Sequence, residues 1–346
     1  MSNTKENIIA RNSRVILLFN LTSEYRSEIM GVAIIWVMLL HGSELYADVH
    51  IPILTAIMNR GNIGVDIFLF LSGFGLFFSV SKNKNTTEFY KRRVNRVLIP
   101  YLILSLPFWI YNTIYCGAGI RKFLADYTGI SFISEGVTVA WYVFLIIFLY
   151  IIYPFVFKFE DKKGVIADLV LIFTSVLICV ILSKINTDLY NKIEIAATRV
   201  PCFILGSMAA RAYVGKQRNY CFFIVVYFFL ATIAFALCAF VNSYDHKLGV
   251  MMYRFGGISA ALIVITAICL FFKMIKKHIA ILKYLGTISL ELYLIHIFLR
   301  HGLVNYHIGE DMPAVIKCFI WLLTMVLSIV LGSIFHYFYE RIRNKQ

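Results

Sequence analysis

Long apolar segments, separated by short polar ones, follow one another along almost the whole chain. Four of them contain no Asp, Glu, Lys or Arg: 97–120, 136–157, 219–243 and 318–339. Six shorter segments complete the series: 29–46, 61–80, 168–183, 195–211, 249–272 and 284–302. Because a helix needs roughly 20 apolar residues to cross a bilayer, the pattern predicts ten membrane-spanning helices.

The composition supports the same class. Hydrophobic residues make up 60% of the chain and charged residues 15%, whereas a soluble domain carries about 25% charged residues. We expect an all-α, polytopic membrane protein with one membrane domain over 25–340. A cytoplasmic segment, 1–24, precedes this domain and a cytoplasmic tail, 341–346, follows it. The first segment reads as polar and lacks the pattern of a cleavable signal peptide, so the first span would be an uncleaved anchor.

The net charge of +14 is unevenly distributed among the loops. Alternate loops hold 23 of the 33 Lys and Arg residues: 1–28, 81–96, 158–164, 211–218, 273–283 and the residues after 339. Cytoplasmic loops carry this excess in membrane proteins. The distribution of charge therefore predicts that both termini face the cytoplasm. We expect the protein to lie in a cell membrane, either a bacterial inner membrane or a plasma membrane. The charge favours membrane lipids and phosphorylated small molecules as partners, and argues against nucleic acid.

The seven cysteines lie mostly within the apolar segments and show no CxxC spacing. Small buried thiols in such positions are typical packing residues. The sequence therefore predicts neither a disulfide framework nor a metal site.

A few ionisable residues interrupt the apolar segments, and burying them in hydrocarbon is costly unless they pair or line a cavity. They are His41, Asp66, Arg199, Arg254, Glu291 and His296. Asp66 lies in the first turn of the second span. It either stabilises the helix N-terminus, where a carboxylate is favourable, or orients His41 on the preceding helix. His41 is a candidate general base, and the alternative is a histidine satisfied at the membrane interface.

A basic cluster precedes the third span and contains Arg92, Arg93 and Arg96. An ordinary membrane anchor explains such a cluster. However, Arg92 and Arg96 share a helix face at i, i+4 spacing, and the planar guanidinium suits phosphate oxygens. The cluster is therefore a candidate site for a molecule with several phosphates.

The later spans carry further polar positions. Arg199 and Glu291 lie on helices that run in opposite directions, so we expect them to neutralise each other around a hydrated pocket, with Arg254 and His296 as alternative partners. A purely structural ion pair is the competing interpretation. Trp141 and Tyr142 are additional site candidates at the start of the fourth span.

Taken in order, these segments resemble the acyltransferase 3 family of integral membrane acyltransferases over residues 25 to 340. The matching blocks are His41 at the end of the first apolar run, Gly64-Val65-Asp66-Ile67-Phe68 with Ser72-Gly73, Arg92-Arg93 with Arg96 and Pro100, Trp141-Tyr142, and Ser289 with Tyr293-Leu294-Ile295-His296. The resemblance implies ten or so helices and transfer of an acyl group, usually acetyl, from acyl-CoA. It implies a carbohydrate or lipid-linked glycan hydroxyl as acceptor, a catalytic His41, and arginines that bind the coenzyme.

One position departs from the family pattern. The family usually has Arg eleven residues before the catalytic His, and this chain has Met30 there. Arg26 lies one helical turn earlier on roughly the same face. We expect Arg26 to take the role of the family arginine that is missing at position 30. The alternative is that Arg26 anchors the helix at the lipid headgroups.

Two other classes of protein would also explain ionisable residues within membrane spans. A transporter or flippase for a polysaccharide precursor needs polar groups along its pathway, and a structural membrane protein packs them against one another. Turnover of acyl-CoA separates an acyltransferase from both.

Overall fold

Helices form all the regular secondary structure in the part of the chain that the structure describes, residues 15–49, 51–215 and 218–343. The structure is a computed structural model. The long helices are α2 (Arg26–Leu45), α4 (Ile63–Lys82), α6 (Ile99–Tyr115), α9 (Trp141–Lys163), α10 (Val165–Ile185), α12 (Val200–Gly215), α13 (Arg218–Asn242), α14 (His246–Ile275), α16 (Ser289–Asn305) and α17 (Ala314–Arg343). The short ones are α3 (Pro52–Met58), α5 (Thr86–Arg93), the π-helix η1 (Val94–Leu98), α7 (Ile120–Thr128), α8 (Ile130–Ser134), α11 (Thr187–Ala197) and α15 (Ala280–Thr287).

The predicted spans are confirmed by length and composition. Within the described residues, nine helical stretches are long and apolar enough to cross a membrane. A tenth is obtained if α15 and α16, bent by 72° relative to each other, count as one span. The all-α, polytopic class is therefore correct, and the orientation of the termini stays a prediction.

The N-terminal segment is less polar than we expected. A short apolar helix runs over Val15–Glu24, and Phe19 and Leu21 within it are buried in the main core. The interpretation of 1–24 as a polar segment is wrong for this stretch, because Val15-Ile16-Leu17-Leu18-Phe19 is a continuous apolar run. The remainder, 1–14, and the end of the predicted tail, 344–346, lie outside the described residues.

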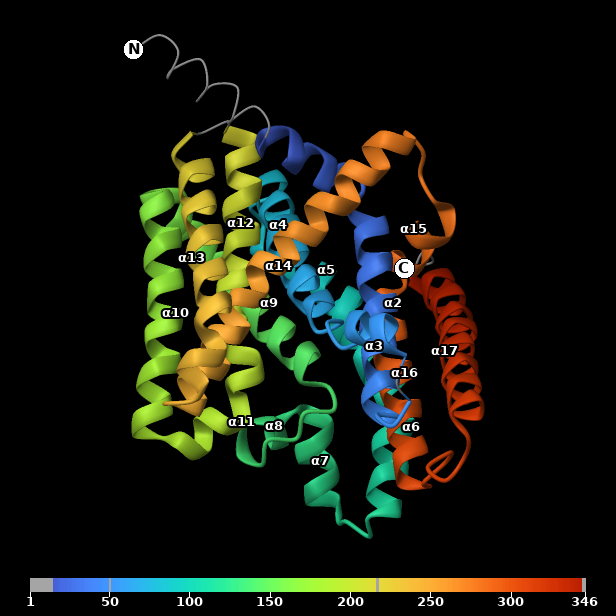
Figure 1. Ribbon diagram of the computed structural model, residues 1–346. Helices are drawn as coiled ribbons and strands as arrows, with labels where there is room; N and C mark the ends of the chain where they lie inside the picture. Colours follow the sequence, from blue (N-terminus) through green and yellow to red (C-terminus); the bar gives the residue numbers. More distant parts are fainter. Residues whose placement is uncertain (1–14, 50, 216–217, 344–346) are drawn as a thin grey trace, which may run out of the picture.

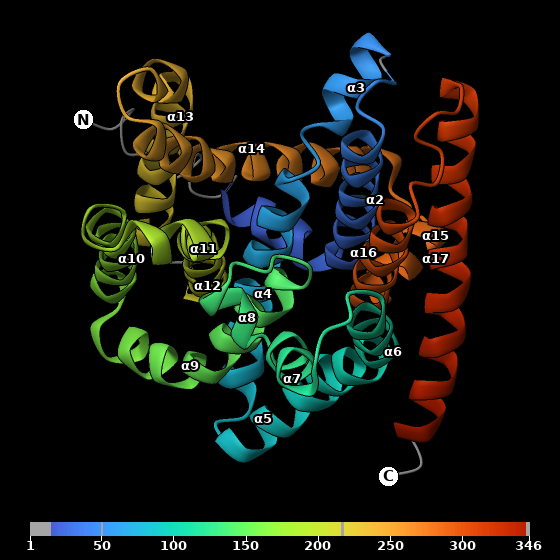
Figure 2. The ribbon, with the colours of Figure 1, turned by 90° about the horizontal axis from the view of Figure 1, so that it is seen from below.

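The helices form a bundle whose middle is occupied by α2 and α4 (Figures 1 and 2). α10 and α13 lie at one edge of the bundle and α17 lies at the other in both views. α4 packs along α12 and α2 packs along α15. Five of the residues that the sequence singled out lie on α2, α4 and α16: Arg26, His41, Asp66, Glu291 and His296.

Glycines allow the central helices to approach closely. A Cβ atom added to Gly206 of α12 would lie 1.9 Å from the Phe70 carbonyl oxygen of α4, and one on Gly286 of α15 would lie 1.8 Å from the Ser27 carbonyl oxygen of α2. Any side chain at either position would push backbone away from backbone. These two contacts fix α4 against α12 and α2 against α15.

Breaks in the helices position several polar side chains. The α11–α12 chain is interrupted at Thr198 and Arg199, directly before α12. Asn95 and Arg96 lie in η1, between α5 and α6. π-Helical turns inside α-helices are frequent at functional sites. The interruptions thus coincide with two of the candidate basic residues.

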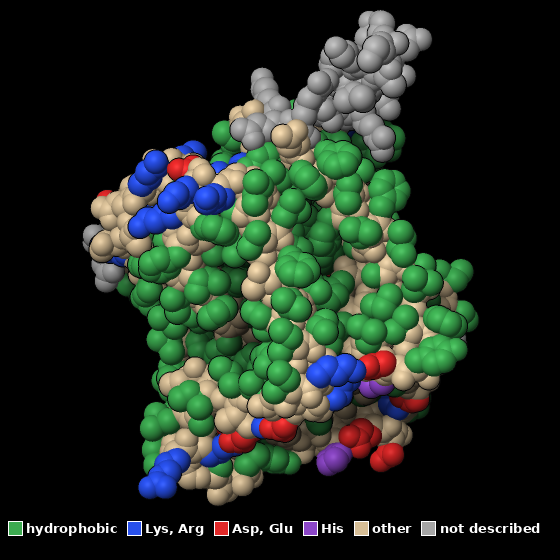
Figure 3. All heavy atoms as spheres, turned by 90° about the vertical axis from the view of Figure 1, so that its left-hand side faces the viewer, with side chains coloured by type: hydrophobic (Ala, Val, Ile, Leu, Met, Phe, Trp, Pro, Cys, Tyr) green, Lys and Arg blue, Asp and Glu red, His purple; other side chains and the backbone are tan. Residues whose placement is uncertain are grey.

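The charged side chains lie at the two ends of the bundle. In Figure 3, Lys and Arg side chains gather at the upper left, a broad hydrophobic surface crosses the middle, and acidic, basic and His side chains mix along the lower side. We call the end that carries the loops 81–85, 158–164 and 276–279 the basic end. The other end is the opposite end.

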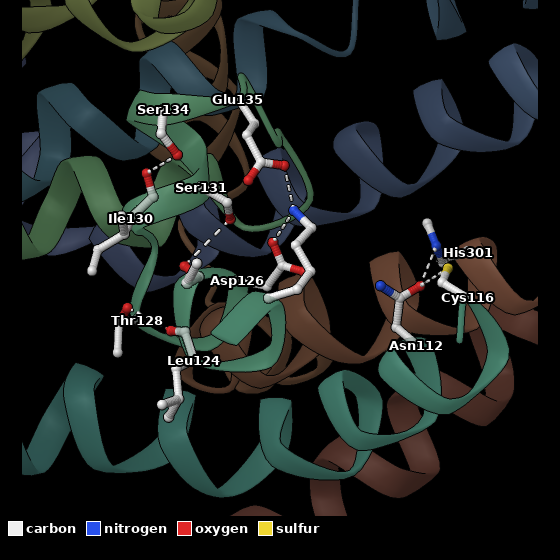
Figure 4. Close-up of polar contacts among 12 residues, drawn as sticks. Asn112, Cys116, Leu124, Asp126, Thr128, Ile130, Ser131, Ser134, Glu135 and His301 are labelled. Atoms are coloured by element: carbon white, nitrogen blue, oxygen red, sulfur yellow. Dashed lines mark hydrogen bonds and ion pairs between the residues drawn. The ribbon is translucent and has the colours of Figure 1, made fainter. Parts of the chain in front are cut away.

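Ion pairs and caps stabilise the loops of the opposite end. The Lys122 ammonium of α7 donates to Asp126 at 2.8 Å and to Glu135 at 2.5 Å (Figure 4). The Asp245 carboxylate caps α14 through the Leu248 N–H. It also accepts a hydrogen bond from the Lys184 ammonium, which lowers the pKa of Asp245.

Candidate active site

Arginine side chains gather at the basic end of α2 and of η1. Arg26 is the first residue of α2, Arg93 ends α5 and Arg96 lies in η1. All three line one cavity of about 410 Å³ between α2, α4, α9, α16 and α17. We call it the inner cavity, and Arg343 at the end of α17 lines it too. Of the two cavities described here, it has the larger number of arginines in its lining.

Hydrogen bonds hold two of these arginines but leave donors free. Arg26 Nη2 donates to the Leu71 carbonyl oxygen at 3.1 Å, and Arg93 Nη2 donates to Ser79 Oγ at 3.0 Å. The Nε atoms of Arg26 and Arg93 are buried and meet no acceptor among the described residues. A buried donor without an acceptor is costly. Two of the arginines that line the inner cavity therefore have donors without acceptors.

Arg92 does not join this cluster. Its side chain is exposed and pairs with Glu88, 3.4 Å away and one turn earlier in α5. The expected pairing of Arg92 with Arg96 toward a ligand is therefore wrong. Arg93 and Arg96, at i, i+3 spacing, share the face that lines the cavity, and the acidic neighbour holds Arg92 on another face.

Met30 and Arg26 line the same inner cavity. The prediction that an arginine one turn earlier reaches the region of position 30 therefore agrees with the geometry. Whether the Arg26 guanidinium performs the role of the missing family arginine stays a prediction.

A second cavity, of about 350 Å³, lies toward the opposite end. We call it the outer cavity. His41 and Glu44 of α2 line it, together with Asn59, Asn62 and Trp141. Its lining also includes Arg199, Tyr253 and Arg254. Amide, carboxylate, guanidinium and aromatic groups thus surround a space close to the candidate base.

His41 contacts a second histidine. Its Nδ1 lies 2.8 Å from Nε2 of His296 on α16, and Nδ1 of His296 lies 2.6 Å from the Leu292 carbonyl oxygen. A carbonyl oxygen only accepts, so Nδ1 of a neutral His296 carries the proton and its Nε2 is the acceptor. His41 must then donate from Nδ1. This chain of hydrogen bonds leaves Nε2 of His41 unprotonated, as a general base requires.

Asp66 pairs with Arg199 instead of His41. The Asp66 carboxylate accepts from Arg199 Nε at 3.1 Å, and both side chains are buried. Arg199 also donates to the Ile195 carbonyl oxygen at 2.6 Å and lies 5.1 Å from the ring centre of Trp141. The expected contact between Asp66 and His41 is therefore wrong, because a buried guanidinium needs a carboxylate to offset its desolvation.

The expected pair of Arg199 and Glu291 is wrong as well. Glu291 lines the inner cavity and accepts from His336 of α17 at 2.9 Å. The alternative partner Arg254 forms two hydrogen bonds of 2.6 Å with the Glu194 carboxylate. Asp66, Arg199, Arg254 and Glu291 do each find a partner, as predicted, but His336 and Glu194 were not among the candidates.

The two cavities adjoin. Val37, Val65 and Tyr293 line both of them. Tyr142 lines the inner cavity and Trp141 lines the outer one, so the start of α9 lies beside the same junction. Val37, Val65 and Tyr293, which we call the constriction, therefore lie between the cavity of the arginines and the cavity of His41. The two cavities and the constriction together define a candidate route.

The other histidine of α16 within the span faces away from this route. Nε2 of His301 donates to Asn112 Oδ1 of α6 at 3.2 Å, and Figure 4 shows this contact beside Cys116. His301 lines neither cavity. His296 is likewise absent from both linings, and only His296 contacts His41, so His301 is the control residue for His296.

Three residues that line the cavities were not predicted as site residues from the sequence: Glu44, Tyr293 and His336. Tyr293 precedes His296 by three positions, which places both on one helix face. From this spacing, Tyr293 could have been predicted to lie beside His296. Glu44 and His336 lie near span ends, where polar residues are common. Among the described residues, no group of three or more His, Cys, Asp and Glu side chains is arranged to hold a metal ion.

Comparison with known protein families gives one match. A family model described as an acyltransferase domain, that of the acyltransferase 3 family, matches residues 31–338, nearly the whole chain. No curated protein and no solved structure matches the chain significantly.

Proposed function

The chain belongs to the acyltransferase 3 family of membrane acyltransferases, and from that premise we propose an O-acyl transfer that links the two sides of the membrane. The donor is acyl-CoA, with acetyl-CoA as the first candidate, and it binds from the basic, cytoplasmic end. The acceptor is a hydroxyl of a carbohydrate or lipid-linked glycan at the opposite end. Membrane lipids surround the apolar band.

The inner cavity supports the choice of donor. Coenzyme A carries several phosphate groups, and guanidinium groups bind phosphate oxygens in a planar, bidentate manner. Arg26, Arg93 and Arg96 provide such groups at one cavity, and two of them retain unpaired Nε donors. The phosphates stay at the basic end, while the thin pantetheine arm extends toward the constriction.

The outer cavity supports the acceptor and the base. Polar and aromatic side chains such as Asn59, Asn62 and Trp141 suit the hydroxyls and ring faces of a sugar. Nε2 of His41 takes the proton of the acceptor hydroxyl as its oxygen attacks the thioester carbon. The C–S bond then breaks, the proton passes to the leaving sulfur, and an ester and the free thiol of coenzyme A result. Asp66 acts through Arg199, which packs against Trp141.

The observation that carries this proposal is the junction of the two cavities. A donor too polar to cross the membrane meets an acceptor on the other side only where such a route exists. Arg26, Arg93 and Arg96 line the cavity on one side of Val37, Val65 and Tyr293, and His41 lines the cavity on the other.

The test is acyl transfer in membranes that contain the wild-type protein or a single variant. His41→Ala should abolish release of coenzyme A thiol and ester formation on glycans while the protein still accumulates in the membrane. His301→Phe should retain both activities, because His301 lies outside the two cavities. A well-expressed His41→Ala protein with wild-type activity would contradict the proposal.

The alternative is a transporter or flippase for a polysaccharide precursor. It too would use a polar route across the bundle. Its activity would move the glycan without releasing the thiol of coenzyme A, so the same assay separates the two functions.

A further inference from the structure

Tyr293 occupies an unusual place in the molecule. Its ring lines both cavities at their junction, and the residue is only 4% exposed. Its hydroxyl is buried and meets no hydrogen-bond partner among the described residues. Buried tyrosine hydroxyls usually find a partner. Tyr293 therefore carries a buried, unpartnered hydroxyl at the junction of the two cavities.

The neighbours of Tyr293 are the groups of the proposed reaction. The Tyr293 ring centre lies 5.9 Å from that of His296, which in turn is hydrogen-bonded to His41. The Tyr293 ring also packs edge-on against Tyr142 at 5.4 Å. Tyr142 lies in the first turn of α9, where backbone N–H groups lack intrahelical acceptors. The Tyr293 ring thus packs beside the N-terminus of α9, the helix end that carries positive partial charge.

Acyl transfer needs a donor at such a place. When the acceptor oxygen attacks the thioester carbon, the carbonyl oxygen gains a negative charge that an apolar constriction would leave unsolvated. A fixed hydrogen-bond donor directed at this oxygen is often the largest single contribution to catalysis. Val37 and Val65, which line the junction with Tyr293, have no side-chain donor.

We infer that Tyr293 is a further catalytic residue, whose hydroxyl donates a hydrogen bond to the thioester carbonyl oxygen. This inference rests on the proposed function. The proton stays on the tyrosine oxygen throughout. His41 receives the proton of the acceptor hydroxyl and returns it to the sulfur when the C–S bond breaks. The hydrogen bond to Tyr293 strengthens as the oxyanion forms and weakens when the carbonyl is restored.

The first experiment compares two matched tyrosine variants. Tyr293→Phe removes the hydroxyl and keeps the ring. It should lower kcat by about 10²–10³, the range for loss of one oxyanion donor, with little change in KM for acetyl-CoA. Tyr190→Phe is the control, because the Tyr190 hydroxyl is also buried without a partner but lies outside both cavities. It should leave kcat unchanged.

The second experiment measures binding and does not depend on turnover. A ketone analogue of acetyl-CoA keeps the carbonyl, and the S-ethyl thioether of coenzyme A lacks it. The wild type should bind the ketone at least about tenfold more tightly than the thioether, because only the ketone can accept a hydrogen bond from Tyr293. Tyr293→Phe should lose this preference while binding the thioether as the wild type does.

The outcomes separate the inference from the function beneath it. A wild-type protein that transfers no acyl group overturns the proposed function. A wild-type enzyme whose Tyr293→Phe variant keeps kcat within about threefold, or keeps the preference for the ketone, overturns the role of Tyr293 alone. If Tyr293→Phe accumulates poorly, the role of Tyr293 is judged from the preference of the remaining protein for the ketone over the thioether.

Discussion

At the scale of single residues, the histidine pair defines the reacting atom. The Leu292 carbonyl oxygen fixes the tautomer of His296, and His296 fixes that of His41. His296→Phe should therefore lower kcat by about 10²-fold, the lower range for general-base catalysis. His296→Gln should recover part of the loss, because its amide oxygen can accept from His41 Nδ1.

The measurement is acyl transfer across a range of pH for both variants. A positioning role predicts that His296→Phe changes the shape of the pH profile and that His301→Phe does not. An unchanged kcat and pH profile in His296→Phe would mean that the hydrogen bond between the histidines is only structural.

The arginines permit a second test with a built-in control. Arg93→Lys and Arg96→Lys keep the charge but lose the bidentate geometry for phosphate. Each should weaken acetyl-CoA binding by about tenfold, which corresponds to roughly one charged hydrogen bond. Arg92→Lys should bind normally, because Arg92 is exposed and paired with Glu88. Equal behaviour of all three variants in a binding titration would favour a membrane anchor.

At the scale of helices, close packing of α4 against α12 holds Asp66 beside Arg199. Gly206→Ala would place a Cβ atom 1.9 Å from the Phe70 carbonyl oxygen, so the two helices must separate. We expect a loss of at least about 2 kcal/mol in stability, as for other overpacked sites, together with reduced acyl transfer.

Thermal unfolding and activity of the purified protein measure this effect. Gly302→Ala in α16 is the matched control, because a Cβ atom there meets nothing within 4 Å. A Gly206→Ala protein as stable and active as the control would show that α4 and α12 can shift without harm to the Asp66–Arg199 pair.

At the scale of the whole molecule, the sequence predicts the spans far better than the contacts between them. Length and hydropathy determine whether a segment can cross a bilayer. Nine of the ten predicted spans therefore agree with long apolar helices in the described residues, and the tenth agrees with the bent pair α15 and α16. The burial of Asp66 and Arg199 was also evident, since charges in apolar runs must be neutralised.

The contact partner of each buried polar side chain cannot be predicted from the sequence in the same way. Asp66 and Arg199 are 133 positions apart, and His41 and His296 are 255 apart. Their pairing depends on which helices pack side by side and on the rotation of each, which no local pattern specifies. For that reason Asp66 was assigned to His41 and Glu291 to Arg199. The apolar Val15–Glu24 helix was missed because nearby charges mask its short run.

We propose that donor and acceptor react from opposite sides of the membrane. The most direct test of this proposal uses sealed vesicles from cells that make the protein, with radiolabelled acetyl-CoA added only outside. Inverted vesicles, which expose the cytoplasmic side, should incorporate label into glycans enclosed within them, and vesicles with His41→Ala should not. Label in right-side-out vesicles to the same extent, or glycan transport without any label, would contradict the account.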